Sequence, residues 1–128
     1  MDDFNWVKMR AECSLPAVFE RLKAQLQQDV DERKTLLERG PEPHYGLKLV
    51  INGKNAAVVL DGNGSQDSVL FRLADTAIEI IHRSGKVLCT ATPTLNDEGQ
   101  CRLIVEGKER ELWHFRKMGL EELFFRKS

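Results

Sequence analysis

The chain has 128 residues, of which 41% are hydrophobic and 30% are charged, and its formal net charge is -1. This length and composition predict one globular domain, residues 1–128, with a single hydrophobic core. The small net charge provides no general attraction to nucleic acid or to an anionic membrane, and the longest apolar runs are too short to cross a bilayer. The acidic N-terminal segment lacks the pattern of a secretory or mitochondrial leader, so we expect a cytoplasmic protein.

Two helices are expected ahead of the strands. The first covers residues 3–12, with an aspartate at position 2 or 3 as its cap. The second begins at Ser14 and ends before Gly40, and its apolar stripe at helical spacing consists of Leu15, Val18, Phe19, Leu22, Leu26, Val30, Leu36 and Leu37. Asp29 and Arg33 interrupt this stripe. Either the helix overhangs the core there, or the two residues form a register-fixing ion pair at a helix–helix contact.

Residues 44–106 are expected to form short strands joined by turns. The dipeptide Asn52-Gly53 favours a two-residue hairpin, which predicts the pairs Ile51 with Lys54, Leu49 with Ala56, Leu47 with Val58 and Tyr45 with Leu60. Gly99 supplies a left-handed position in the turn that begins at Asn96, which predicts the pairs Leu95 with Cys101, Pro93 with Leu103 and Ala91 with Val105. In both registers the apolar side chains share one face, so we expect that face to be buried.

Residues 68–83 fit two structures. As two strands they turn near Asp75 and pair Leu73 with Ile78, Phe71 with Ile80 and Arg72 with Glu79, the last a favourable charge pair. As one helix they also separate apolar from polar residues cleanly, and Gly85 would end that helix. The β-branched isoleucines and the alternation that continues from Val87 favour the strands.

A C-terminal helix is expected over residues 109–127, with two apolar stripes. One stripe contains Trp113 and is expected to face the core. The other consists of Phe115, Met118 and Phe125. One helix with two apolar stripes covers two surfaces or leaves one stripe for a partner, so these three residues are the candidate interaction surface.

The sequence contains no motif that indicates a reaction, a metal or a cofactor. Its three cysteines are odd in number and widely spaced, which argues against a disulfide framework and for a reducing compartment. Residues 61–67 resemble the start of a calcium loop, but Gln66 occupies the required glycine position. Basic and acidic residues alternate in the long helix and in the tail, so we expect no nucleic-acid partner.

These patterns predict an α+β fold, an antiparallel meander of about six strands with the N-terminal and C-terminal helices packed on one face. The first functional hypothesis is a non-enzymatic module that binds a protein, with a second copy of itself as the expected partner. The alternative is a small-molecule or catalytic site between helix and sheet, for which His44, His82 and Cys13 are the first residues to test. We expect no cofactor and no metal site.

Overall fold

A computed structural model describes residues 3–39, 46–62 and 65–125 of the chain. Within these residues the elements in chain order are α1 (Trp6–Glu12), α2 (Leu15–Arg39), β1 (Gly46–Asn52), β2 (Asn55–Gly62), β3 (Ser65–Leu73), β4 (Ile78–His82), β5 (Val87–Leu95), β6 (Cys101–Val105), β7 (Lys108–Arg110) and α3 (Leu112–Phe125). The strands form one antiparallel sheet in which each strand pairs with its neighbours in sequence. The fold is therefore the α+β meander that the sequence predicts.

The described sheet has seven strands rather than about six. The additional strand is β7, which pairs with β6 and takes the residues that were expected to begin the C-terminal helix. Glu106 and Gly107 both adopt positive φ angles between β6 and β7, so the chain reverses there before α3 begins at Leu112.

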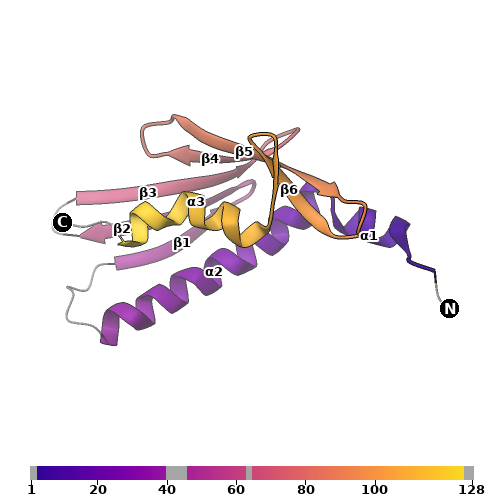
Figure 1. Cartoon of the computed structure of the whole chain (residues 1–128). Coiled ribbons are helices and arrows are strands. Elements are labelled where there is room, and N and C mark those ends of the chain that lie inside the picture. The colour runs from indigo at the N-terminus through magenta and orange to yellow at the C-terminus, as the bar shows by residue number, and fades with distance from the viewer. Residues whose placement is uncertain (1–2, 40–45, 63–64, 126–128) are drawn as a thin grey trace.

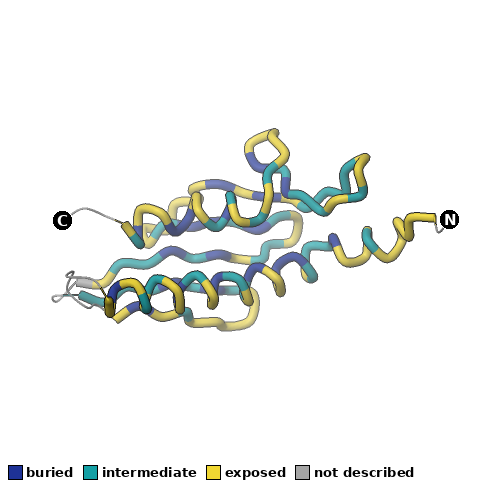
Figure 2. The backbone as a smooth tube through the Cα atoms, turned by 60° about the horizontal axis from the view of Figure 1, so that its bottom comes forward, coloured by how far each residue is buried: buried dark blue, intermediate teal, exposed yellow. Residues whose placement is uncertain are grey.

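The helices α2 and α3 lie against the sheet and against each other, while α1 extends past the end of the strands (Figure 1). Their buried residues lie mainly on the sides that face the strands (Figure 2). In the part of the chain that the structure describes, no helix combines the length and the apolar character that a membrane crossing requires.

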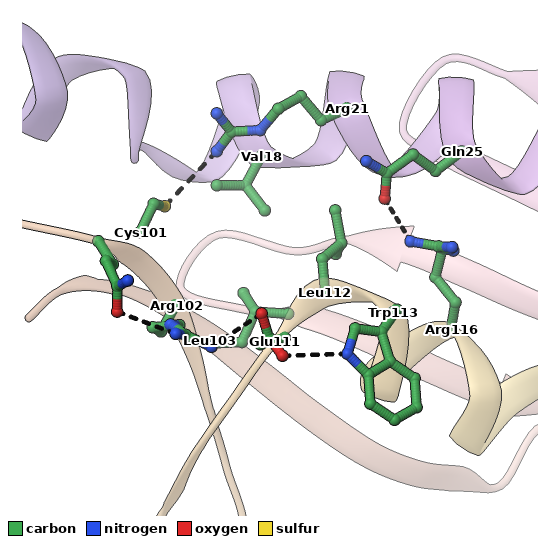
Figure 3. Close-up of a pocket in the computed structure, with 11 residues that line it drawn as sticks. Val18, Arg21, Gln25, Cys101, Arg102, Leu103, Glu111, Leu112, Trp113 and Arg116 are labelled. Carbon is green, nitrogen blue, oxygen red and sulfur yellow. Dashed lines mark hydrogen bonds and ion pairs between the residues drawn. The ribbon is translucent and has the colours of Figure 1, made fainter.

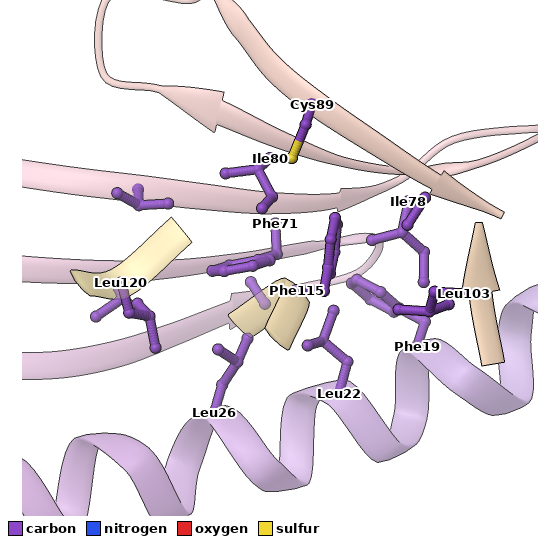
Figure 4. Close-up of a cluster of buried hydrophobic side chains, with 14 of the residues drawn as sticks. Phe19, Leu22, Leu26, Phe71, Ile78, Ile80, Cys89, Leu103, Phe115 and Leu120 are labelled. Carbon is purple, nitrogen blue, oxygen red and sulfur yellow. The ribbon is translucent and has the colours of Figure 1, made fainter. Parts of the chain in front are cut away.

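The hydrophobic core lies where the two helices meet the inner face of the sheet (Figure 4). The rings of Phe71 from β3 and Phe115 from α3 make an edge-to-face contact, with centroids 6.0 Å apart. Leu22 and Leu26 from α2 belong to the same cluster as the two rings, and all four side chains are fully buried. Gly119 allows this packing, because a Cβ atom on it would lie only 2.5 Å from Cζ of Phe71.

Local sequence signals explain the helix boundaries. Asn5, rather than an aspartate, caps α1 by accepting a hydrogen bond from the backbone N–H of Lys8. The hydroxyl of Ser14 accepts from the N–H of Ala17 at the start of α2, as its sequence predicts. Asp29 lies at the contact between α2 and α3, where it pairs with Arg116.

The strand registers confirm one predicted turn and correct the other. Leu95 pairs with Cys101 and Ala91 with Val105, as expected from the positive φ angle of Gly99. At the first hairpin, however, Asn52 pairs with Asn55, so that Leu49 lies opposite Val58 instead of Ala56 and Leu47 opposite Leu60 instead of Val58. The turn is Gly53-Lys54, with glycine in the first central position, where a positive φ angle is needed. The shift of two residues keeps the apolar face unchanged. Tyr45 lies outside the described residues.

Residues 68–82 belong to β3, β4 and the turn between them, and Arg83 begins the next turn, which settles the choice between strands and helix. The predicted pairs Leu73 with Ile78, Phe71 with Ile80 and Arg72 with Glu79 are all present. The guanidinium of Arg72 lies 2.6 Å from the carboxylate of Glu79.

Candidate functional site

The three residues that the sequence suggested for a catalytic site do not form one. His44 lies outside the described residues. His82 is at the end of β4, and its Nδ1 atom accepts a hydrogen bond from the backbone N–H of Ser84. A bulge after Ile80 pairs Ile81, rather than His82, with Val87 at the start of β5. His82 is therefore a histidine bonded at a turn.

Cys13 forms a disulfide with Cys101, which contradicts the expectation of unpaired cysteines. Cys13 is buried between α1 and α2, and the start of β6 brings Cys101 to it across 88 residues of sequence. Cys13 is therefore not available as a catalytic thiol. A reducing compartment is no longer indicated by the cysteines, because that expectation assumed that no disulfide forms.

The two apolar stripes of the C-terminal helix are arranged differently from the expectation. Phe115, expected in the interaction surface, is 0% exposed and lies in the core. Trp113, expected to face the core, is 52% exposed, whereas Met118 and Phe125 are 40% and 59% exposed. Gly119 is the reason, because its lack of a side chain brings that side of the helix close to the sheet and buries Phe115 with it.

A hollow of about 410 Å³ lies between α2, the start of β6 and the start of α3 (Figure 3). We call it the arginine pocket, and its lining consists of Val18, Arg21, Gln25, Gln100, Cys101, Arg102, Leu103, Glu111, Leu112, Trp113 and Arg116. Three guanidinium groups and one carboxylate face this space. Its electrostatic potential is therefore expected to be positive.

Two of the three arginines are held by neighbouring side chains. Arg116 donates from Nε to Asp29 Oδ2 at 2.7 Å and from Nη1 to Gln25 Oε1. Arg102 lies 3.1 Å from a carboxylate oxygen of Glu111 and donates to Gln100 at 2.9 Å. Pairs of this kind restrict the guanidinium planes while leaving part of each group facing the pocket.

Arg21 and Trp113 complete the pocket from opposite ends. Arg21 is exposed on α2, and its Nη2 atom lies 3.5 Å from Sγ of Cys101. Among the described residues, Arg21 has no carboxylate within ion-pair distance. The indole N–H of Trp113 donates to Glu111 at 3.1 Å, which holds the ring at the side of the pocket (Figure 3).

The arginine pocket was not predicted from the sequence, in which its arginines count only as parts of balanced charge on each segment. Arg21, Gln25 and Asp29 follow one another at a spacing of four, which places them in a polar row beside the apolar stripe of α2. That row was the available signal. The sequence gives no comparable sign that Arg102 and Arg116 lie across from it.

A second hollow, of about 250 Å³, runs between α2 and α3 on the side away from the sheet. We call it the α2–α3 groove, and its lining consists of Asp29, Glu32, Arg33, Leu36, Trp113, Arg116, Lys117, Leu120, Phe124 and Phe125. The guanidinium of Arg33 lies over the ring of Phe125 at 4.3 Å and donates to the carbonyl oxygen of Phe124. Large apolar side chains with basic and acidic neighbours therefore share this surface.

The remaining cysteine, Cys89, is a buried thiol on the inner face of β5. Burial, together with the nearby carboxylate of Glu106, raises its pKa from 9.0 to about 11. Its thiolate is therefore scarce at neutral pH, and the residue packs as a small apolar side chain.

Within the described residues, no cluster of histidine, cysteine and acidic side chains could hold a metal ion. Comparisons with known proteins found no matching family model, curated protein or solved structure.

Proposed function

We propose that this chain is a protein-binding module that pairs with a second copy of itself through the α2–α3 groove. The observation that carries the proposal is the exposure of three large apolar side chains along this groove. Leu36, Trp113 and Phe125 are 46%, 52% and 59% exposed. Exposed apolar residues gathered around one hollow are typical of surfaces that bind another protein.

The charges beside the groove support a second copy as the partner. Asp29 and Glu32 come from α2, whereas Lys117 and Arg116 come from α3, so both signs lie on the same surface. Asp29 and Arg116 pair with each other within one copy, so a two-fold contact would bring Glu32 of one copy to Lys117 of the other. A strongly acidic or strongly basic partner would instead be expected to bind a groove whose charged side chains are mostly of the opposite sign. The net charge of -1 also adds little repulsion between copies.

Sedimentation equilibrium tests this proposal. We expect the parent to show a monomer–dimer equilibrium in the micromolar range and Phe125→Glu to be monomeric, because the substitution removes a large apolar side chain from the contact and puts a charge in its place. Met118→Glu is the matched control, since Met118 is an exposed apolar residue of the same helix outside the groove lining. A parent that stays monomeric at all accessible concentrations contradicts the proposal. Equal dissociation by Phe125→Glu and Met118→Glu would contradict the choice of the groove.

A further inference from the structure

We propose that the arginine pocket binds a small organic carboxylate with an apolar body. This site is separate in its chemistry from the proposed self-association. The three guanidinium groups of Arg21, Arg102 and Arg116 face a space that contains one carboxylate, that of Glu111. A guanidinium offers several N–H donors in a plane, an arrangement that fits the two oxygens of a carboxylate.

Arg21 is the residue that we assign to the ligand. Arg102 and Arg116 already have carboxylate partners in Glu111 and Asp29. The hydrogen bond from Arg21 goes instead to the sulfur of Cys101, which is a weak acceptor. Exchange of this sulfur for a ligand carboxylate would replace a weak hydrogen bond with a charge-assisted one. Arg21 can therefore bind an anion without breaking an ion pair of the free protein.

The apolar part of the lining determines the rest of the ligand. Val18 and Leu103 are buried and form the floor of the pocket, and Leu112 lies beside them. The indole of Trp113 stands at the side, held by its hydrogen bond to Glu111. A volume of about 410 Å³ is in the usual range for small-molecule sites. An aromatic or branched aliphatic carboxylate would place its body on this floor and its charge toward Arg21.

The two tryptophans of the chain allow a direct test by nuclear magnetic resonance. Trp113 lines the pocket, whereas Trp6 is exposed on α1 and serves as an internal reference. We titrate naphthalene-2-carboxylate and follow the two indole N–H signals. The expected result is a saturable shift of the Trp113 signal and none of the Trp6 signal. The same titration with neutral naphthalene-2-carboxamide should show an affinity at least about tenfold lower.

Variants identify the residue that binds the charge. Arg21→Gln should weaken binding of the carboxylate about tenfold and leave binding of the carboxamide unchanged. Arg39→Gln is the matched control, because Arg39 is an exposed arginine at the other end of α2. Equal affinity for carboxylate and carboxamide, no saturable shift, or equal weakening by Arg21→Gln and Arg39→Gln would each overturn the proposal.

Two further titrations distinguish the pocket from the groove and charge from apolar contact. Trp113 also lines the α2–α3 groove, so the titration is repeated with Phe125→Glu. Binding that persists in this variant supports the pocket and is independent of self-association, whereas binding that disappears belongs to the groove and overturns the proposal.

Inorganic phosphate alone tests whether charge is sufficient. If phosphate shifts the Trp113 signal as much as the naphthalene carboxylate does, and binds with equal affinity, the assignment of an apolar body is overturned.

Discussion

Substitution of Gly119 by alanine tests the close approach of α3 to the sheet. In an open helix this change should stabilise by about 1 kcal/mol, because alanine has the higher helix propensity. Here the added Cβ would lie 2.5 Å from Cζ of Phe71 and 3.3 Å from a methyl carbon of Ile80. Carbon atoms pack best about 3.5 to 4.0 Å apart, so α3 or Phe71 must move by roughly 1 Å. Phe71 is fully buried against Phe115 and has no open space to enter.

Overpacking costs about 1 to 3 kcal/mol, and an approach of 2.5 Å to a fully buried ring belongs to the upper half of that range, about 2 to 3 kcal/mol. After subtraction of the gain in propensity of about 1 kcal/mol, we expect Gly119→Ala to lower the free energy of unfolding by about 1 to 2 kcal/mol. Urea unfolding followed by circular dichroism measures this difference. Phe71→Leu in the same chain should recover part of the loss, because it removes the atoms that clash, and the double-mutant cycle gives the coupling. If Gly119→Ala is as stable as the parent or more stable, α3 does not lie where the structure places it.

Other predictions concern the core, the disulfide, a turn and the buried thiol. Phe115→Ala should cost about 3 to 5 kcal/mol and Trp113→Ala only about 1 kcal/mol, and the opposite order in urea unfolding would contradict the burial described for α3. Cys13→Ser should cost about 4 kcal/mol, because the disulfide closes a loop with a sequence separation of 88. Two additional reactive thiols in the oxidised parent would show that this bond is absent. Gly99→Val should cost about 1 to 2 kcal/mol in thermal unfolding, since φ is +78° there, and an unchanged melting temperature would contradict the turn. Because burial raises the pKa of Cys89 from 9.0 to about 11, stability should be unaffected below pH 9.0 and fall as pH rises from 9.0 to about 11. Cys89→Ala should lack this component of the decline, and an identical pH profile would refute the assignment.

The sequence predicted the strand pairing correctly at two of the three turns that were used to set a register. Glycine at position 99 and the charge pair of Arg72 with Glu79 predicted strands and registers that the structure contains. At Gly53 the same reasoning put the turn one residue too early, because glycine can serve either central position of a two-residue turn. The alternation of apolar residues still identified the buried face, since a shift of two residues does not change it.

The sequence predicted the candidate sites poorly, because they depend on contacts between distant segments. Spacing along the chain gave no sign that Cys13 and Cys101 lie together. Arg21 and Arg102 likewise meet only after α2 and β6 have packed against each other. On α3, periodicity predicted two stripes, but the structure buries part of each: Phe115 from one, and Leu120 and Leu123 from the stripe that contains Trp113. The burial of Phe115 depends on Gly119, whose missing side chain matters only beside Phe71.

The disulfide also determines how the protein would carry mechanical load. A pull on the two termini passes from α1 through Cys13 to Cys101 and on to β6, β7 and α3. The whole of α2 and the strands β1 to β5 lie between the two cysteines in sequence, so the covalent path of the load bypasses them while the bond is intact. Reduction would add the 88-residue separation to the extensible chain, or roughly 300 Å at full extension. The oxidised protein would therefore behave as a short tether that protects most of its sheet, and the reduced protein as a long one.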